Sequence, residues 1–166
     1  MVRREPTDLP RHALRSGLGL VGWLVASFAA ATFGGFFSPG EWYASLQKPS
    51  WTPPSWVFGP VWTVLYTMMA VAAWLVWRQG GLAAQRRPLG LFVIQLALNA
   101  GWTPLFFGLR RPDLAFAEIV LLWVAIAATL AAFRRVSVTA AWLLAPYLAW
   151  VSFAAALNLA LWRLNP

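Results

Sequence analysis

Polar and aromatic side chains recur at helical spacing inside three long apolar segments of the chain. Residues three or four positions apart lie on one face of an α-helix. Each such stripe alone is typical of packing between helices, because Asn and Gln commonly hydrogen-bond to a neighbouring helix. Three stripes that mix aromatic rings with small or amide side chains favour a shared binding cavity. They are Gln95, Asn99 and Trp102; Tyr147, Trp150, Ala154 and Asn158; and Trp62, Tyr66 and Met69.

Residues that support other chemistry are scarce. Glu118 is the one acid within an apolar segment, and a structural hydrogen bond to an amide is a better interpretation of it than catalysis. The chain has no cysteine, and its one histidine, His12, lies in a basic N-terminal tail where we expect it to be solvated. The sequence contains no nucleophile elbow, phosphate-binding loop or metal-ligand cluster. It therefore gives no support for hydrolysis or metal chemistry, and neither a metal site nor a required cofactor is predicted.

The composition indicates what kind of protein positions these stripes. Hydrophobic residues make up 60% of the 166 residues and charged residues only 11%, whereas about 25% of a typical soluble domain is charged. The mean hydropathy is +0.63. The chain also has twelve tryptophans, and indole favours the membrane–water interface. Together these features predict a protein that crosses a membrane several times.

Five segments are apolar and long enough to span a bilayer, which takes about 20 residues. We predict an all-α membrane protein, a bundle of five transmembrane helices that forms a single domain over residues 1–166. A long structured loop, residues 37–54, joins the first two helices. Pro88 is expected at a helix start, and Asp113 is expected to cap the fourth helix. The five predicted spans are residues 17–36, 55–77, 88–107, 114–133 and 138–162.

Basic residues lie singly or in pairs at the ends of the apolar segments. Charge so placed orients a membrane protein, so the formal net charge of +8 does not indicate nucleic-acid binding. Nine basic residues lie on the side of the N-terminus and four on the opposite side, which predicts a cytoplasmic N-terminus in a bacterial cell membrane. The nine on the side of the N-terminus are Arg3, Arg4, Arg11, Arg15, Arg78, Arg86, Arg87, Arg134 and Arg135, and the four on the opposite side are Lys48, Arg110, Arg111 and Arg163.

The segment from Glu41 to Trp62 is unusual for a connection between membrane helices. It holds four tryptophans and four prolines but only two charged residues. Prolines restrict the backbone and lower the entropy lost when a loop is ordered. We therefore expect an ordered loop, with the indoles of Trp42, Trp51 and Trp56 filling the space between it and the helix ends.

Two small residues, Ala97 and Gly101, lie four positions apart on the third segment. Such a pair lets another helix approach closely. The sequence leaves open whether that helix belongs to the same chain or to a second copy in a homodimer.

The tryptophan- and proline-rich segment closely resembles the signature of the translocator protein (TspO/MBR) family. This family is also called the tryptophan-rich sensory proteins or peripheral benzodiazepine receptors. The matches run in family order from about residue 17 to residue 165. They include Trp42-Tyr43-x-x-Leu46-x-Lys48-Pro49-Ser50-Trp51-x-Pro53-Pro54-x-Trp56-Val57-x-Gly59-Pro60-Val61-Trp62, then Gln95-Leu-Ala-Leu-Asn99-x-x-Trp102-x-Pro104-x-Phe106-Phe107-Gly108, then Pro146-Tyr147-Leu148-Ala149-Trp150, and finally Leu157-Asn158 ahead of Trp162-Arg163.

The resemblance implies five transmembrane helices, usually in a homodimer, with the long first loop as a lid over the mouth of a pocket. That pocket takes porphyrins and, in many members, isoquinoline carboxamide and benzodiazepine drugs. Trp62 and Trp150 would present flat faces to a flat macrocycle, and small Ala154 would leave room for it. By position, the ligand-binding residues would be Tyr43, Pro53, Trp62, Tyr66, Asn99, Trp102, Thr103, Leu114, Ile119, Trp150 and Ala154.

Two departures from the family pattern bear on the ligand. The cholesterol-recognition pattern near the end of the last helix requires a tyrosine, and residues 157–163 contain none; cholesterol binding is therefore in doubt. Leu114 stands where the family usually has a tryptophan, so drug affinity is expected to differ from that of animal members. The missing cholesterol pattern and the bias toward arginine, alanine and leucine fit a bacterial member.

Three functions share the predicted pocket. The favoured one is a membrane protein that binds protoporphyrin IX or haem as a ligand and acts in stress- or light-linked regulation. The second is an enzyme that degrades porphyrin in light, with Trp62 and Trp150 as oxidisable rings. The third is a transporter of porphyrin, sterol or another small molecule, although the sequence shows neither a charged relay nor a repeat. A purely structural membrane protein would explain the helix packing but not the three stripes.

Overall fold

The computed structural model describes residues 8–37 and 39–166, with side chains from Leu14 onward. Five helices in this part of the chain are long and apolar enough to cross a membrane, which confirms the predicted all-α architecture. They are α1 (Asp8–Gly35), α3 (Phe58–Trp77), α5 (Arg86–Thr103), α6 (Pro112–Arg134) and α7 (Val138–Leu164). Short helical segments lie in the connections: α2 (Glu41–Ser45), η1 (Ser55–Val57), α4 (Gly81–Ala84) and η2 (Pro104–Gly108).

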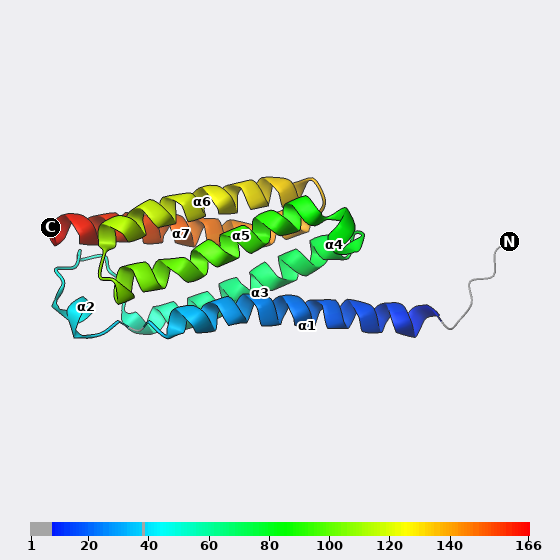
Figure 1. Cartoon of the computed structure of the whole chain (residues 1–166), viewed down its shortest axis with the longest axis horizontal. Helices are drawn as coiled ribbons and strands as arrows, with labels where there is room; N and C mark the ends of the chain where they lie inside the picture. The colour runs from blue at the N-terminus through cyan, green and yellow to red at the C-terminus, as the bar shows by residue number, and fades with distance from the viewer. Residues whose placement is uncertain (1–7, 38) are drawn as a thin grey trace.

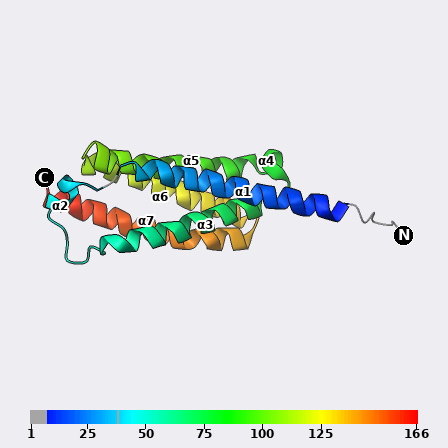
Figure 2. The ribbon, with the colours of Figure 1, turned by 90° about the horizontal axis from the view of Figure 1, so that it is seen from below.

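The long helices run lengthwise beside one another (Figures 1 and 2), and their contacts close into a ring. Helix α1 packs against α3 and α5, α3 against α7, α7 against α6, and α6 against α5. A ring of this kind gives every long helix one face toward a common interior. The polar and aromatic stripes predicted on three of these helices can therefore meet there.

The first helix is longer than its predicted span, because it begins at Asp8 rather than at Gly17. It extends past the other helices at the end of the bundle where α4 lies (Figures 1 and 2). The side chain of His12, expected to be solvated, lies outside the described residues. Pro88 falls in the first turn of α5, which begins at Arg86, as expected for a proline at a helix start.

The start of the fourth long helix differs from the prediction. Asp113 does not cap α6; Arg111 occupies the capping position and the helix begins at Pro112. The fixed φ of proline suits the first helical position, so the helix starts one residue before Asp113. The carboxylate instead pairs with the guanidinium of Arg111, at 2.5 Å from Nη2 and 2.8 Å from Nε. A side-chain cap is present on α7, where Ser137 Oγ accepts a hydrogen bond from the Ala140 amide at 3.2 Å.

Helix α5 ends in the wider turn η2. Pro104 has no amide hydrogen to continue the α-helical ladder, and its carbonyl accepts from the Leu109 amide, five residues on, at 2.8 Å. Such π-turns are frequent at functional sites. Here the turn directs Phe106 into the interior, where its ring is fully buried.

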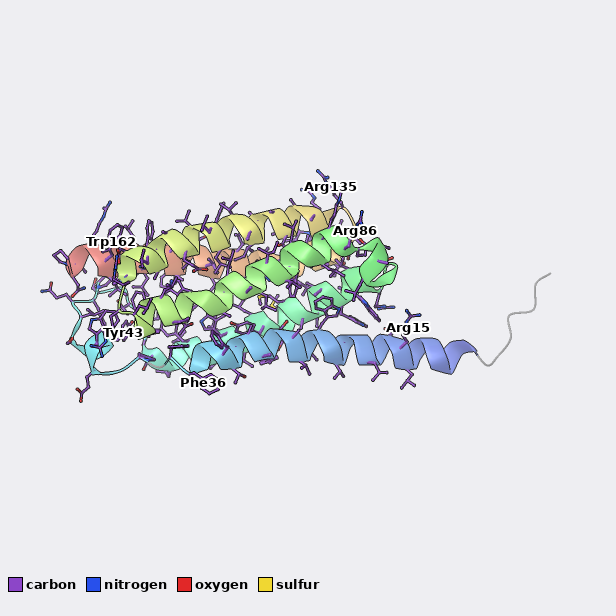
Figure 3. All side chains as sticks on the ribbon, viewed as in Figure 1. Arg15, Phe36, Tyr43, Arg86, Arg135 and Trp162 are labelled. Atoms are coloured by element: carbon purple, nitrogen blue, oxygen red, sulfur yellow. The ribbon has the colours of Figure 1, made fainter. Side chains whose placement is uncertain are left out.

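The two ends of the bundle differ in character (Figure 3). Arg15, Arg86 and Arg135 lie at one end, which we call the arginine end, whereas Tyr43 and Trp162 lie at the other, the lid end. Toward the arginine end the buried rings of Phe92 and Phe133 stack inside the bundle, with centroids 6.0 Å apart. Toward the lid end the interior of the bundle contains a cavity.

Candidate ligand-binding cavity

A cavity of about 830 Å³ lies inside the bundle beneath the lid, residues 37–54. All five long helices and the lid contribute to its wall. Small-molecule sites in proteins typically have volumes of about 300–1,000 Å³ and mainly apolar walls with a few polar groups. The cavity has both properties and is the candidate ligand-binding site.

Ten of the eleven residues expected to contact a ligand line this cavity. They include the two tryptophans expected to stack on a flat ligand. The lid, α3, α5, α6 and α7 all supply some of them, so residues from distant parts of the sequence are brought together. The ten are Tyr43, Pro53, Trp62, Tyr66, Asn99, Trp102, Thr103, Ile119, Trp150 and Ala154.

Leu114 is the exception and requires a correction. It is 42% exposed and does not belong to the cavity wall. Ala115, Ile119 and Leu122 are buried and spaced by four and three positions, so they form the inward face of α6. Leu114 comes one residue before Ala115, a rotation of about 100° around the helix, and therefore lies off that face.

Two of the three lid tryptophans pack as expected, and the third does not. Trp42 lies edge-on to Phe106 with ring centroids 5.8 Å apart, and Trp51 lies edge-on to Phe153 at 5.7 Å. Trp56 is 75% exposed. It belongs to the tight turn η1, in which residues three apart share a side. Ser55 and Phe58 line the cavity, so Trp56 lies on the other side of this turn.

Aromatic rings form two walls of the cavity. Trp62 on α3 lies against Tyr66, with centroids 5.4 Å apart, and approaches Tyr147 at 6.2 Å. On α7, Trp150 packs against Phe58 at 5.8 Å and Phe153 at 5.5 Å. Both indoles are thus held by neighbouring rings, which fixes the orientation of the surface that they present.

A buried hydrogen-bond chain crosses three helices next to the cavity. The Tyr66 hydroxyl on α3 donates to Asn99 Oδ1 on α5, and Asn99 Nδ2 donates to the Tyr147 hydroxyl on α7 at 3.0 Å. The Asn99 amide therefore hydrogen-bonds to both tyrosines at once. Tyr66, Asn99 and Tyr147 thus join α3, α5 and α7, and Tyr66 and Asn99 also line the cavity.

A second amide, Asn158, fixes the position of Trp102. The Trp102 indole N–H donates to Asn158 Oδ1 at 3.0 Å, and Asn158 Nδ2 donates to the Pro112 carbonyl at 2.8 Å. The Trp102 ring stacks on Phe106 with centroids 4.8 Å apart and a 20° angle between the planes. The end of α5, the start of α6 and helix α7 are joined in this way.

The lid closes over the cavity through Tyr43, which packs edge-on against Phe106 at 6.2 Å and Phe107 at 5.4 Å. Its partial burial raises the pKa of the Tyr43 phenol above the usual value, because ionisation would place a charge next to these rings. Tyr43 is therefore neutral at physiological pH and can donate a hydrogen bond.

The TspO/MBR family profile matches residues 23–163. The chain belongs to the TspO/MBR family. It is 46% identical over 150 residues to the translocator protein of Homo sapiens, an alignment that covers 87% of this chain and 89% of that protein.

Bacterial relatives in the TspO/MBR family are about as similar. The tryptophan-rich protein TspO of Chlorobaculum tepidum is 46% identical over 148 residues, covering 86% of this chain and 90% of the relative. The tryptophan-rich sensory protein of Cereibacter sphaeroides is 42% identical over 143 residues, covering 86% and 89%. Membership of the TspO/MBR family together with five apolar helices implies a ligand-binding, multi-pass membrane protein.

Two residues of this TspO/MBR protein were not recognised as parts of the site from the sequence. Lys48 is the one charged side chain among the described residues that line the cavity. Its ammonium donates to the carbonyls of Ala44 at 3.1 Å and Leu46 at 3.2 Å, and lies 4.8 Å from the Tyr43 ring centroid. An ammonium has three donors, so one is left for a ligand.

The second is Asn165, just beyond the end of α7. Its Oδ1 accepts from the Gln47 amide at 2.9 Å, and its Nδ2 donates to the Gln47 carbonyl at 3.0 Å. The Asn165 side chain pairs with the lid backbone through these two hydrogen bonds. They hold the lid, which follows α1, against the end of α7. Sequence alone gives no signal for this contact, which joins residues 118 positions apart.

Glu118 and Gln95 do not have the partners expected for them. The Glu118 carboxylate oxygens and the Gln95 amide are buried, and neither side chain hydrogen-bonds to another described residue. Glu118 was predicted to bind an amide, and the structure does not show this bond.

The small residues of α5 lie on its outer side. Ala97 is exposed, and a Cβ atom added to Gly101 would meet no described atom within 4 Å. This pair therefore does not serve a close helix contact within the chain. The exposed surface is available to a second copy of the protein.

Proposed function

We propose that this protein binds a tetrapyrrole of the protoporphyrin IX or haem class in the cavity beneath the lid and acts in stress- or light-linked regulation of porphyrin. The observation that carries the proposal is the pair of indoles, Trp62 from α3 and Trp150 from α7, in the wall of an 830 Å³ cavity. A porphyrin is flat, aromatic and largely apolar, so it matches these surfaces. Stacking on aromatic rings contributes about 0.5–1.5 kcal/mol per pair beyond the area buried.

A porphyrin also carries propionate groups, and Lys48 supplies a cation for one of them. A charge-assisted hydrogen bond is about twice as strong as a neutral one. Since the rest of the described wall is uncharged, the cavity favours a ligand with an apolar body and an anionic edge. Isoquinoline carboxamide and benzodiazepine-type ligands share the flat apolar body and are expected to compete for the same space, and so is membrane lipid.

We also propose that the protein works as a homodimer in a bacterial cell membrane with its N-terminus cytoplasmic. The exposed surface around Ala97 and Gly101 on α5 supports the first point, because small residues allow two helices to approach closely. The basic residues gathered at the arginine end support the second. Neither statement is needed for ligand binding within one chain.

Lys48 offers a test of the ligand chemistry. We expect Lys48→Met to weaken binding of protoporphyrin IX in the dark about 5- to 20-fold, because the carboxylate loses a charged donor. Binding of the dimethyl ester, which has no carboxylate, should be nearly the same in wild type and variant. Tryptophan quenching measures both titrations.

Arg163→Gln provides the matched control. This substitution also removes a positive charge at the lid end, but Arg163 is exposed and does not line the cavity. It should leave both affinities within about twofold, since exposed charges are largely screened. Equal losses for the acid and the ester in Lys48→Met would mean that the lysine only holds the lid, and the assigned carboxylate contact would be wrong.

Light-dependent degradation of porphyrin is a second candidate, favoured by the same two oxidisable indoles in the cavity wall. It predicts that bound protoporphyrin IX disappears faster under illumination than free porphyrin at the same absorbed light. Equal rates would remove the enzymatic candidate and leave the binding function standing. Transport, the remaining candidate, predicts porphyrin flux into sealed vesicles that contain only this protein.

A further inference from the structure

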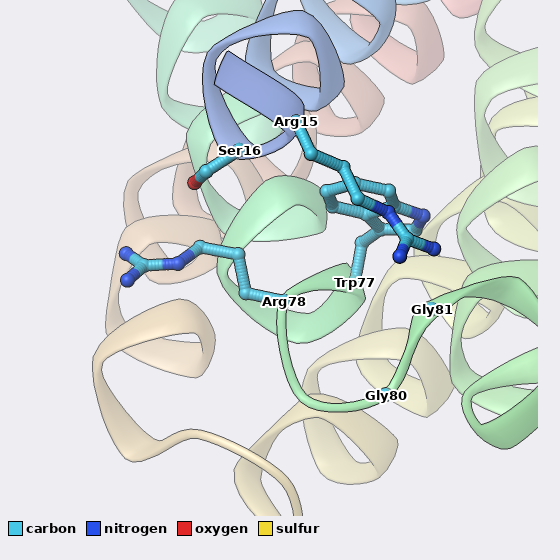
Figure 4. Close-up of a pocket in the computed structure, with 6 residues that line it drawn as sticks. All are labelled: Arg15, Ser16, Trp77, Arg78, Gly80 and Gly81. Carbon is cyan, nitrogen blue, oxygen red and sulfur yellow. The ribbon is translucent and has the colours of Figure 1, made fainter. Parts of the chain in front are cut away.

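We propose that a second pocket, at the arginine end of the bundle, binds the phosphate group of an anionic phospholipid. This pocket has a volume of about 390 Å³ and lies between the start of α1 and the turn that follows α3 (Figure 4). None of its residues lines the cavity beneath the lid, so the two sites are separate. It is lined by Arg15, Ser16, Trp77, Arg78, Gly80 and Gly81.

The walls of this pocket are fixed by contacts between α1 and α3. The Trp74 indole N–H donates to the Ser16 carbonyl at 2.8 Å. One turn further on, Gly19 lets the Trp77 ring lie directly against α1; a Cβ atom at Gly19 would be only 2.3 Å from that ring. Trp77 is therefore held in place as a wall.

Glycines leave the floor of the pocket open. Gly80 and Gly81 have φ angles of +125° and +77°, values that glycine adopts without strain. A Cβ atom at Gly81 would meet nothing within 4 Å. The turn after α3 can thus reverse the chain without placing a side chain in the pocket.

The charge of the pocket is positive, and no acid whose side chain the structure describes forms an ion pair with it. Arg15 extends past the Trp77 ring, while Arg78 extends to the other side of the pocket (Figure 4), its guanidinium over the Trp74 ring at 4.6 Å. Among the side chains that the structure describes, the one ion pair joins Arg111 to Asp113, at the lid end. Two guanidinium groups that have no carboxylate partner among the described side chains favour binding of an anion.

The position of this pocket favours an anionic phospholipid over other anions. The pocket lies where α1 and α3 leave the apolar part of the bundle, and Leu14 and Leu18, on either side of Arg15 along α1, are both exposed. A lipid with its phosphate between the arginines can lay its acyl chains along this apolar surface. Basic pockets between membrane helices on the cytoplasmic side are known to hold anionic head groups, and tryptophan favours the same depth.

The test measures lipid retained by the detergent-purified full-length protein with native mass spectrometry. Phosphatidylglycerol is titrated against wild type and against the double variant Arg15→Gln/Arg78→Gln. Each basic residue near an anionic surface contributes about fivefold in affinity, so we expect the double variant to bind about 25-fold more weakly. Phosphatidylcholine, which has no net charge, should bind wild type about as weakly as phosphatidylglycerol binds the variant.

The matched control is Arg86→Gln/Arg87→Gln. It removes the same charge at the same end of the bundle from two exposed residues outside the pocket, and should change the phosphatidylglycerol affinity less than about threefold. Both arginines of the pocket are exposed, so folding should survive; Arg15→Lys/Arg78→Lys, which keeps the charge, should retain most of the binding.

Three results would overturn the proposal. The first is an equal loss in the control, which would indicate attraction by the overall charge of this end. The second is equal binding of phosphatidylglycerol and phosphatidylcholine to wild type. The third is full displacement of phosphatidylglycerol by millimolar inorganic phosphate, which would make the pocket a site for a free anion rather than for a lipid.

Discussion

Replacing Ala154 by phenylalanine is expected to weaken protoporphyrin IX binding by about 100-fold or more, because the new ring would occupy the space that the ligand needs. Ala154 lies on α7 one turn after Trp150 and lines the cavity. The protein itself should remain folded, since the side chain enters an existing cavity rather than a packed core. Titration of the purified variant in the dark, followed by tryptophan quenching, measures the loss.

Ala156→Phe is the control for this experiment. It makes the same change two positions along the same helix, but Ala156 is exposed and does not line the cavity. It should bind porphyrin like wild type. If Ala154→Phe also bound like wild type while keeping its helical circular dichroism, the ligand would have to occupy another part of the molecule.

Replacing Asn99 by leucine is expected to lower the free energy of unfolding by about 2 kcal/mol. Asn99 satisfies the hydroxyls of both Tyr66 and Tyr147, and its loss leaves two buried hydroxyls without a partner. An unpaired buried polar group costs about 1–3 kcal/mol, whereas hydrogen bonds between membrane helices contribute only about 0.6 kcal/mol each on average. Reversible unfolding in mixed micelles with sodium dodecyl sulfate measures the change.

A double-mutant cycle separates the hydrogen-bond chain from simple packing. Adding Tyr147→Phe to Asn99→Leu removes one of the stranded hydroxyls, so the double variant should be more stable than the sum of the single changes predicts. Additive losses would show that the tyrosine and the amide act independently. In that case the three-helix chain would not be what holds this wall of the cavity together.

Much of the site could be predicted because membrane helices have a regular period. Within each of three apolar segments, the helical spacing of polar and aromatic residues placed them on one helix face, the faces that carry Tyr66, Asn99 and Tyr147. A ring of five helices turns those faces inward. The prolines and indoles between Glu41 and Trp62 indicated an ordered loop, and the resemblance to the TspO/MBR family implied that this loop is a lid. Periodicity and composition are local properties, so a single sequence expresses them directly.

The features that the sequence did not predict depend on tertiary contacts or on the exact start of a helix. Asn165 hydrogen-bonds to the backbone of Gln47, which lies 118 positions earlier in the chain, and no local pattern encodes such a pair. The starting point of α6 at Pro112 determines where Asp113 and Leu114 lie, and a shift of one residue rotates a side chain by about 100°.

The pocket at the arginine end illustrates the same limit. Arg15 and Arg78 stand at the ends of two apolar segments, where the sequence indicated only membrane orientation. They line one pocket because α1 and α3 pack together, as the contact between Gly19 and the Trp77 ring shows, and a helix period alone does not reveal such packing.

The central claim is that a tetrapyrrole binds between Trp62 and Trp150, and a dark titration of purified protein with protoporphyrin IX tests it most directly. Wild type should show one saturable site. Trp62→Phe and Trp150→Phe should each weaken it about 3- to 10-fold, because a smaller ring offers less stacking surface, and the double variant should weaken it further. Trp142→Phe, which alters an exposed indole, should bind like wild type. Saturable binding that is unchanged in both cavity variants, or no saturable binding to wild type, would contradict the account.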